Sequence, residues 1–274
     1  MPPMNDITFR DLQKGFRELG LTPESRVLAH TALSAFGHVR GGAEALVAAL
    51  TSTCRLVVVP TFTEQCQILP LVGPAENGMT YGDRYADNAE AEMFLPEVPA
   101  HADMGVTAET LRHHPDARRS SHPLLSFAAV GPGAAELLAA QTLAEPFAPL
   151  ERLAELGGDV LLLGVDHTRN AAVHLAERRA GRKQFVRWAF TPAGVVQCPA
   201  WPGCSEGFAA LDPHVRALTR TARVGGALLQ RLPLADLLSA AEALILSDPT
   251  ALLCAREDCE RCAAVRRAVS QPAG

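Results

Sequence analysis

The sequence of 274 residues lacks the long apolar run that a membrane-spanning helix requires. Such a helix needs about 20 consecutive, mostly apolar residues, and no stretch of this chain approaches that length. Its first residues, MPPMNDITFR, contain an acidic side chain and no apolar segment of the kind found in secretory signals. We therefore expect a cytoplasmic protein with no membrane partner.

An excess of basic residues is also missing. Lys and Arg total 25 against 30 Asp and Glu, which gives a formal net charge of −5. Because a protein that mainly binds nucleic acid usually presents a basic surface, we expect no nucleic-acid partner. The chain contains neither GxGxxG nor a Walker A motif, so it carries no sequence signature of a nucleotide-binding fold. The pattern gives no indication of an oligomeric state.

Repeats, low-complexity segments and clear linkers are absent, so we expect a single domain over residues 1–274. Apolar runs that predict buried strands alternate with stretches of helical spacing, and this alternation indicates an α/β fold. A late hairpin signal adds an antiparallel element, so we predict a mixed sheet with helices on both sides. The predicted strands are 26–29, 55–60, 127–131, 159–165 and the hairpin 187–199. The predicted helices are 6–20, 42–52, 108–113, 133–140, 149–156, 170–179 and most of 211–246.

A candidate catalytic group follows the predicted strand 159–165. Asn170, His174 and Glu177 are spaced to share one face of the next helix, and His167 lies at the strand–helix junction. A histidine beside a carboxylate can act as a general base, because the carboxylate fixes the tautomer and stabilises the imidazolium that forms. A surface histidine in an ordinary ion pair would show the same spacing.

Two other segments place polar residues beside predicted core strands. HTALSAFG (30–37) joins a strand to a helix, and backbone N–H groups at such a turn can bind a phosphate or a pantetheine amide. Arg118, Arg119, Ser120 and His122 precede another strand, and arginines bind phosphates through paired hydrogen bonds. A plain connector in the first case and a solvated charged turn in the second are the alternatives.

Residues 61–110 carry nine Asp and Glu, and Arg84 is the only Lys or Arg among them. Such a local field suits a polycationic ligand. Segment 62–103 has no sustained period, and we interpret it as a long loop region of the kind that lines a site. Asp83, Glu90 and Glu92 are candidate ligands for the cation. A solvated acidic loop is the alternative.

Seven cysteines in a chain of this length do not indicate a disulfide scaffold. Cys259-x-x-Cys262 has a spacing common in zinc sites, and Cys254 lies close by in the sequence. Cys204 is the best candidate for the fourth ligand, with Cys198 as a substitute. A site of four thiolates would be structural, because it leaves no open coordination position. Free thiols are the alternative.

Four ordered segments of the chain resemble the aminoglycoside 3-N-acetyltransferase family. They are HTALSAFG, LVVVPTFT, RSSHPLLSFAAVG and LLLGVDHTRNAAVHLAE, and their order and spacing match over nearly the whole chain. A further segment, RVGGALLQRLPLADLL (223–238), resembles a late helix of the family. The chain departs from the family at Ala171-Ala172, where hydrogen-bonding side chains are usual. The resemblance implies a mixed α/β fold distinct from that of the GNAT acetyltransferases.

For function, the resemblance implies acetyl-CoA as donor and an aminoglycoside or other polycationic amine as acceptor, with antibiotic resistance as the outcome. His174 matches the general base and Glu177 its partner, and His167 and Asn170 fall on motif positions near the site. His167 is thus a further catalytic candidate and Asn170 a candidate substrate contact. By the same match, the candidate acetyl-CoA contacts are His30, Thr31, Ser34, Gly37, Arg119, Ser120 and His122. Direct transfer in a ternary complex is the implied mechanism.

Some members of the family carry cysteine-rich segments at the positions of Cys204 and Cys259-x-x-Cys262, with a histidine where this chain has Cys254. The resemblance therefore implies a structural Zn²⁺ bound by Cys204, Cys254, Cys259 and Cys262, which would pack residues 250–266 on the body of the protein. Two other functions are open at this point. One is an N-acyltransferase of the same fold that acts on another amine in a biosynthetic pathway. The other is a non-catalytic zinc-binding interaction protein.

Overall fold

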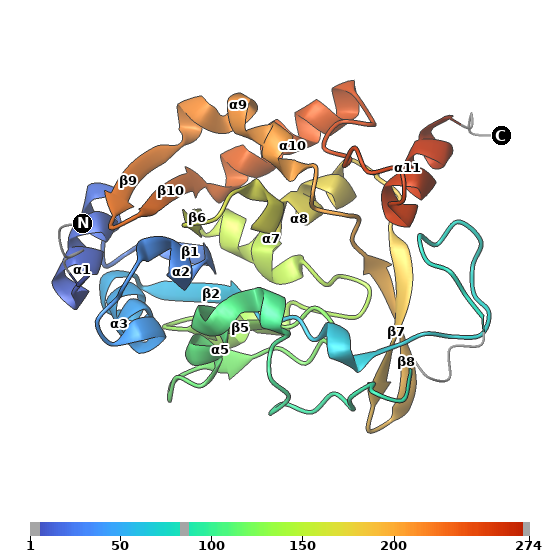
Figure 1. The fold of residues 1–274 in the computed structure, drawn as a ribbon, viewed down its shortest axis with the longest axis horizontal. Helices are drawn as coiled ribbons and strands as arrows, with labels where there is room; N and C mark the ends of the chain where they lie inside the picture. Colours follow the sequence, from blue (N-terminus) through green and yellow to red (C-terminus); the bar gives the residue numbers. More distant parts are fainter. Residues whose placement is uncertain (1–5, 83–87, 271–274) are drawn as a thin grey trace.

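The computed structural model describes residues 6–82 and 88–270, so the predicted ligand Asp83 lies outside the described residues. Its centre is a seven-stranded mixed sheet (Figure 1). The strands are β1 (Arg26–Thr31), β2 (Leu56–Pro60), β4 (Arg118–Arg119), β5 (Phe127–Val130), β6 (Asp159–Leu163), β9 (Arg220–Val224) and β10 (Ala227–Pro233). Their order is β4-β5-β2-β1-β6-β10-β9. β1 pairs parallel with β2 and β6, and the other pairings are antiparallel.

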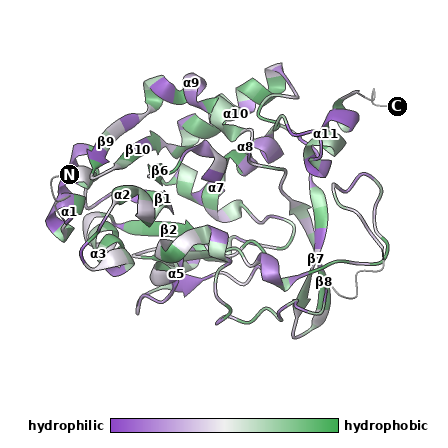
Figure 2. Cartoon of the chain, viewed as in Figure 1, coloured by the Kyte–Doolittle hydropathy of each residue, from purple (hydrophilic) through white to green (hydrophobic). Residues whose placement is uncertain are grey.

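Helices cover both faces of this sheet, as the sequence predicts. One face packs against α1 (Phe9–Glu18), α3 (Gly42–Thr53) and α5 (Gly105–Arg112). The other packs against α6 (Ala134–Ala139), α7 (Ala148–Glu155), α8 (Ala172–Arg179) and α10 (Leu234–Ser247). Successive strand residues point to opposite faces, so Val57 and Val59 enter one core while Leu56 and Val58 enter the other. Figure 2 shows β2 as hydrophobic along its length.

A second, three-stranded antiparallel sheet lies at one end of the molecule (Figure 1). It contains β3 (Gln67–Ile68), β7 (Phe185–Thr191) and β8 (Gly194–Trp201), in the order β3-β7-β8. β7 and β8 confirm the predicted hairpin. Other α-helices among the described residues are α2 (Leu33–Phe36), α9 (Asp212–Val215) and α11 (Glu260–Ser270). Among the described residues, no helix combines the length and apolar character needed to cross a bilayer.

The prediction of a mainly helical stretch over 211–246 holds for α9 (Asp212–Val215) and from Leu234 onward, but it was wrong for residues 220–233. β9 and β10 form an antiparallel hairpin there, and the helix begins only at Leu234. The hairpin turn is Gly225-Gly226, a dipeptide favoured in two-residue hairpins, and Gly225 has a φ of 56°. Leucine-rich sequence suits a helix as well as a strand. Pairing of β10 with β6, which extends the central sheet, decides the outcome here.

The connections between the strands single out one edge of the central sheet. After β1 the chain passes to α3 on one face of the sheet, and after β6 it passes to α8 on the other. In open α/β sheets, ligands bind beyond the carboxyl ends of the strands, where neighbouring connections depart to opposite faces. β1 and β6 are such neighbours, so the fold points to the segments that follow His30 and Leu163.

Candidate active site

His174 and Glu177 come together on α8, as their spacing predicts. Nδ1 of His174 lies 2.8 Å from Oε2 of Glu177. The two side chains are only 11% and 1% exposed, so the pair is not the surface ion pair that the sequence left open. An ionised carboxylate only accepts hydrogen bonds, so Nδ1 carries the proton and Nε2 keeps a free lone pair. The ring can therefore take up a proton at Nε2.

Two phenylalanines enclose the His174 ring. Phe147 stacks on it with a centroid distance of 6.0 Å and an interplanar angle of 29°. Phe208 meets it edge-on, with a centroid distance of 4.8 Å. Such contacts restrict the ring and exclude water from it. Sequence reasoning missed both residues, because they come from distant segments that no local pattern joins to α8.

Arg182 also escaped the sequence analysis. Its Nη1 donates to Glu177 Oε1 at 2.9 Å, and both side chains are almost fully buried. A local signal exists in Gly181, which follows α8 in a left-handed conformation with a φ of 72°. A glycine at this place commonly folds the following residue back over the last turn of a helix.

His30, at the carboxyl end of β1, lies beside the loop that precedes α8. Its Nε2 accepts a hydrogen bond from the backbone N–H of Ala171 at 3.3 Å. Burial lowers the pKa of His30 to about 3, and the nearby charges of His167 and His174 act in the same direction. His30 is therefore neutral at physiological pH. The fold thus gathers three predicted histidines at one edge of the sheet.

His167 and Asn170 hold each other beneath the start of α8. Nδ2 of Asn170 donates to Nδ1 of His167 at 3.1 Å, and its Oδ1 accepts from the Ala172 N–H at 3.1 Å. Burial lowers the pKa of His167, whereas Asp212 and Asp166 act to raise it. These contacts shape the loop before the helix. A catalytic role for His167 and a substrate contact for Asn170 stay predictions.

Arg119 is tied into the protein by its own hydrogen bonds. Its guanidinium donates to Ser126 Oγ at 3.1 Å and to the carbonyl oxygens of Thr61 and Pro96 at 3.0 and 3.1 Å. Burial lowers the pKa of Arg119 to about 10. This geometry fastens the segment around Pro96 to the end of β2. Binding of CoA phosphates by Arg119, which the resemblance implies, is not tested by these contacts.

Ser120 and His122 also make internal contacts. Ser120 Oγ accepts from the Phe127 N–H at 2.9 Å. His122 Nδ1 accepts from the N–H groups of Leu124 and Leu125 at 3.2 and 3.0 Å, and burial lowers the pKa of His122 to about 4. Both residues shape the turn that enters β5. Their predicted contact with acetyl-CoA stays a prediction.

Thr31 is the last residue of β1, Ser34 lies in the short helix α2 that follows, and Gly37 comes directly after α2. Ser34 is exposed, and Thr31 and Gly37 are partly exposed. The N–H of Ala32 donates to the carbonyl oxygen of Leu163 at 3.0 Å, which joins the ends of β1 and β6. The fold therefore places these three predicted CoA contacts at the same sheet edge as the histidines.

Glu90 and Glu92, the described members of the predicted acidic ligands, are exposed. The backbone N–H of Glu92 donates to the carbonyl oxygen of Gln65 at 2.9 Å, which holds this part of the loop against the segment before β3. Exposure leaves both carboxylates accessible to a cationic ligand. Their role in substrate binding stays a prediction.

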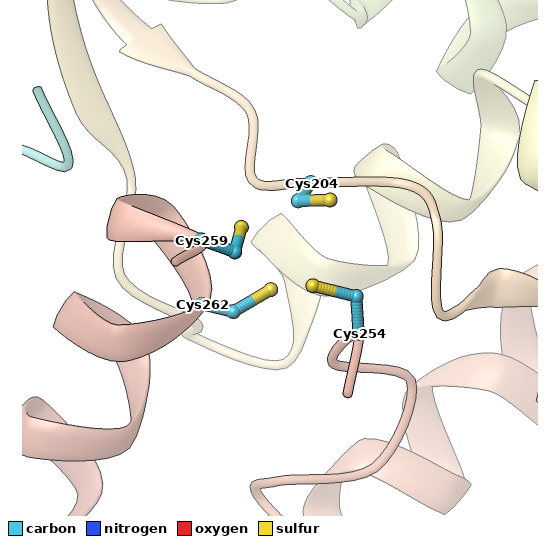
Figure 3. Close-up of side chains that lie close together, drawn as sticks. All are labelled: Cys204, Cys254, Cys259 and Cys262. Atoms are coloured by element: carbon cyan, nitrogen blue, oxygen red, sulfur yellow. The ribbon is translucent and has the colours of Figure 1, made fainter. Parts of the chain in front are cut away.

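Four cysteines converge at the C-terminal end of the protein (Figure 3). The sulfur atoms of Cys204, Cys254, Cys259 and Cys262 all lie within 4.8 Å of one another. Tetrahedral zinc with Zn–S bonds of about 2.3 Å needs sulfurs about 3.8 Å apart, so this donor set fits the ion. The four are the residues that the sequence singled out. The substitute Cys198 lies in β8, where burial raises its pKa to about 12.

Comparison with known proteins settles the family. The family model described as aminoglycoside 3-N-acetyltransferase matches residues 28–245. The chain belongs to this family. It is 34% identical over 214 residues to aminoglycoside N(3)-acetyltransferase III of Salmonella sp, and the match covers 73% of this chain and 71% of that protein. The resemblance seen in the sequence is confirmed, and with it the prediction of an acyltransferase of this type.

Solved structures confirm the fold class. The apoenzyme of aminoglycoside acetyltransferase AAC(3)-IVa has a TM-score of 0.79 and 28% identity, covering 97% of this chain and 99% of that one. A histidine-to-alanine mutant of AAC(3)-IVa, solved in complex with a gentamicin, has a TM-score of 0.78, 26% identity and the same coverage. AAC-IIIb, solved as a binary complex with CoASH, shares the fold at 23% identity, with a TM-score of 0.73 over 88% of this chain and 96% of that one.

Proposed function

We propose that the protein transfers an acetyl group from acetyl-CoA to the 3-amino group of an aminoglycoside, by direct attack in a ternary complex. The observation that carries the proposal is the buried His174–Glu177 pair, with Nε2 of the histidine left free to take a proton. Family membership supports the substrate class. The relatives solved with a gentamicin and with CoASH bind ligands of the two kinds required.

In the proposed reaction, a neutral amine attacks the thioester carbonyl, because an ammonium has no lone pair. As the N–C bond forms, Nε2 of His174 takes a proton from the amine. Collapse of the tetrahedral intermediate breaks the C–S bond, and the imidazolium returns the proton to the departing CoA thiolate. Glu177 stabilises the imidazolium between these two steps. The products are an N-acetylated amine and CoA with a free thiol.

The surroundings of His174 favour this role. Phe147 and Phe208 keep water from the ring, and charge interactions are stronger away from water. Glu177 therefore acts strongly on the imidazolium as it forms. His30 is neutral, so it places no second positive charge beside the ring.

The binding surfaces follow the same edge of the sheet. The accessible segment from the end of β1 through α2, with Thr31, Ser34 and Gly37, would receive the CoA arm near the ends of β1 and β6. The acid-rich segment that carries Glu90 and Glu92 would attract the ammonium groups of the acceptor. Because acetyl-CoA is an intracellular metabolite, the protein would act in the cytoplasm and confer resistance by modifying the drug there.

The test mixes purified protein with acetyl-CoA and a panel of 4,6- and 4,5-linked aminoglycosides and apramycin, and follows release of the free thiol. We expect turnover that His174→Ala lowers by about 10²–10⁴-fold, the range typical of a lost general base. His38→Ala is the matched control, because His38 also contacts a carboxylate but is exposed. NMR of the product would locate the acetyl group.

Two results would contradict the proposal. Undiminished turnover in His174→Ala would exclude His174 as the base. Tight acetyl-CoA binding without thiol release on any aminoglycoside would exclude the acceptor class and favour another amine. The resistance role is tested separately by expressing wild type and His174→Ala in a susceptible bacterium. Only the wild type should raise the inhibitory concentration.

We also propose that Cys204, Cys254, Cys259 and Cys262 hold a structural Zn²⁺. The convergence of four thiols supports this proposal. Metal analysis should find about one zinc per chain, and Cys259→Ser should lose it while Cys198→Ser keeps it. A strong chelator should lower Tm by about 5 °C, the size expected for a loss of about 3 kcal/mol in a chain of this length. Absence of zinc together with an unchanged Tm after chelation would refute the site.

A further inference from the structure

Glu177 is a buried carboxylate with a different partner on each oxygen. Oε2 contacts His174 at 2.8 Å, and Oε1 accepts from Arg182 at 2.9 Å. The carboxylate is 1% exposed and the Arg182 side chain 2% exposed. A buried carboxylate without a counter-charge is strongly unfavourable. Whatever fixes Arg182 therefore also fixes the acid that orients the proposed base.

We propose that Arg182 is a positioning residue, which holds Glu177 in the orientation that keeps the proton of His174 on Nδ1 and leaves Nε2 free. The inference rests on the proposed function, since it assigns a role in the work of the same base. Arg182 acts through Glu177, and its guanidinium hydrogen bonds go to Glu177, Pro249 and Ala251, not to His174.

The end of α8 sets the position of Arg182. The backbone N–H of Arg182 donates to the carbonyl oxygen of Glu177 at 2.9 Å. The backbone N–H of Gly181 donates to the carbonyl oxygen of Arg178 at 3.0 Å. These two bonds, with the left-handed Gly181 between helix and arginine, form a Schellman motif. The motif folds the chain back, so that Arg182 lies over the residue whose carboxylate it binds.

The guanidinium is held from its other side as well. Nη2 donates to the carbonyl oxygens of Pro249 and Ala251 at 2.9 and 2.7 Å. The planar fork of an arginine can join two such groups in one fixed geometry. Arg182 thus links the carboxylate of Glu177 to the loop after α10, which continues to Cys254.

The backbone of Gly203 lies against the Glu177 carboxylate on a third side, in addition to the sides held by His174 and Arg182. A Cβ at that position would lie 3.5 Å from Oε1 and 3.6 Å from Oε2, so the carboxylate rests close against the glycine. With His174, Arg182 and Gly203 around it, Glu177 has little freedom to turn. Loss of Arg182 would free Oε1. The carboxylate could then rotate, or take a proton from solvent and keep it while donating a hydrogen bond to Nδ1. The single proton of the neutral ring would then be on Nε2, which could no longer act as a base.

The experiment compares Arg182→Ala and Arg182→Lys with Arg179→Ala. Arg179 is the matched control, because it lies on α8 but pairs with Glu151 at the surface. We expect Arg182→Ala to lower kcat about 100-fold, the loss typical of a misplaced reacting group, with KM for acetyl-CoA within about twofold of wild type. Added guanidinium should restore part of the kcat. Arg182→Lys, which keeps the charge but not the fork, should fall in between.

A folded Arg182→Ala with kcat within about twofold of Arg179→Ala would overturn the proposal. So would a loss of kcat that guanidinium does not relieve while the NMR signals of His174 stay those of wild type. If Arg182→Ala does not fold, Arg182→Lys decides, and an unchanged kcat in that variant overturns the proposal as well.

A second measurement needs no turnover. In protein with ¹⁵N-labelled histidine, the ring signals of His174 should report a proton on Nδ1 in wild type and Arg179→Ala. In Arg182→Ala they should show exchange between the two ring nitrogens. An identical tautomer in all three proteins would overturn the positioning role. If wild type acetylates no amine, the proposed function fails, but this measurement still decides what Arg182 does to His174.

Discussion

Two histidine–carboxylate pairs in this protein have nearly the same geometry but very different surroundings. Nδ1 of His174 lies 2.8 Å from Glu177, and Nδ1 of His38 lies 2.9 Å from Asp6. The first pair is 11% and 1% exposed, and the second is 73% and 56% exposed. The short distance therefore does not distinguish a general base from a surface contact. The enclosure of the pair does.

The physical difference is the medium around each pair. In water, salt and solvent screen the attraction between His38 and Asp6, and either side chain can turn to solvent without loss. His174 lies between two phenylalanines, and Glu177 is held by Arg182 on its second oxygen. Glu177, with 1% of its side chain exposed, does not have water as an alternative partner. Its orientation is therefore fixed before a substrate arrives.

The largest expected effect comes from removing the charge of the buried acid. Glu177→Gln should lower kcat by about 10³–10⁴-fold, because an amide neither stabilises the imidazolium nor balances Arg182. Asp6→Asn, the same change in the exposed pair, should leave kcat unaltered. Steady-state kinetics on both variants measure the contrast. Equal kcat values for the two would show that burial confers no catalytic advantage on the His174 pair.

Buried histidines should also make stability depend on pH. Burial lowers the pKa of His30 to about 3 and that of His122 to about 4, against about 6.5 when unfolded. Between pH 6.5 and 4 the unfolded chain binds more protons than the folded one. The contribution of these histidines to the free energy of unfolding should thus be fully present above pH 6.5. As the pH is lowered below 6.5, the free energy of unfolding should decrease by about 1.4 kcal/mol per pH unit for each histidine.

Urea unfolding at pH 7, 6 and 5 measures this slope. His30→Gln should reduce the slope by about 1.4 kcal/mol per pH unit, because the glutamine does not titrate. A slope identical to that of wild type would mean that His30 is not held neutral in the folded protein.

The smallest expected effect is on the stability contributed by the exposed pair. Asp6→Asn should change the free energy of unfolding by no more than about 1 kcal/mol, because a surface ion pair is screened and flexible. Adding salt should reduce even that change. Urea unfolding of wild type and Asp6→Asn at low and high salt provides the measurement. A loss well above this size would place the His38–Asp6 pair among the contacts that hold the fold.

The sequence by itself determined the features that repeat along one element. Alternating apolar runs and helical stretches predicted the mixed α/β fold, because strand and helix each have a fixed period. The three-residue spacing of His174 and Glu177 predicted their contact, since one helix turn brings such residues together. The Cys259-x-x-Cys262 spacing predicted half of the thiol cluster, the nearby Cys254 and the resemblance to the family added the rest, and the four ordered segments identified the family.

The tertiary structure alone decided what surrounds these groups. Phe147 and Phe208 reach His174 from segments far apart in the chain, and Cys204 meets the C-terminal cysteines only in the fold. The sequence predicted helix where the hairpin β9–β10 lies, because the local sequence does not indicate that β10 pairs with the distant strand β6. Periodicity is a property of neighbours in sequence. Burial, which separates His174 from His38, is a property of neighbours in space.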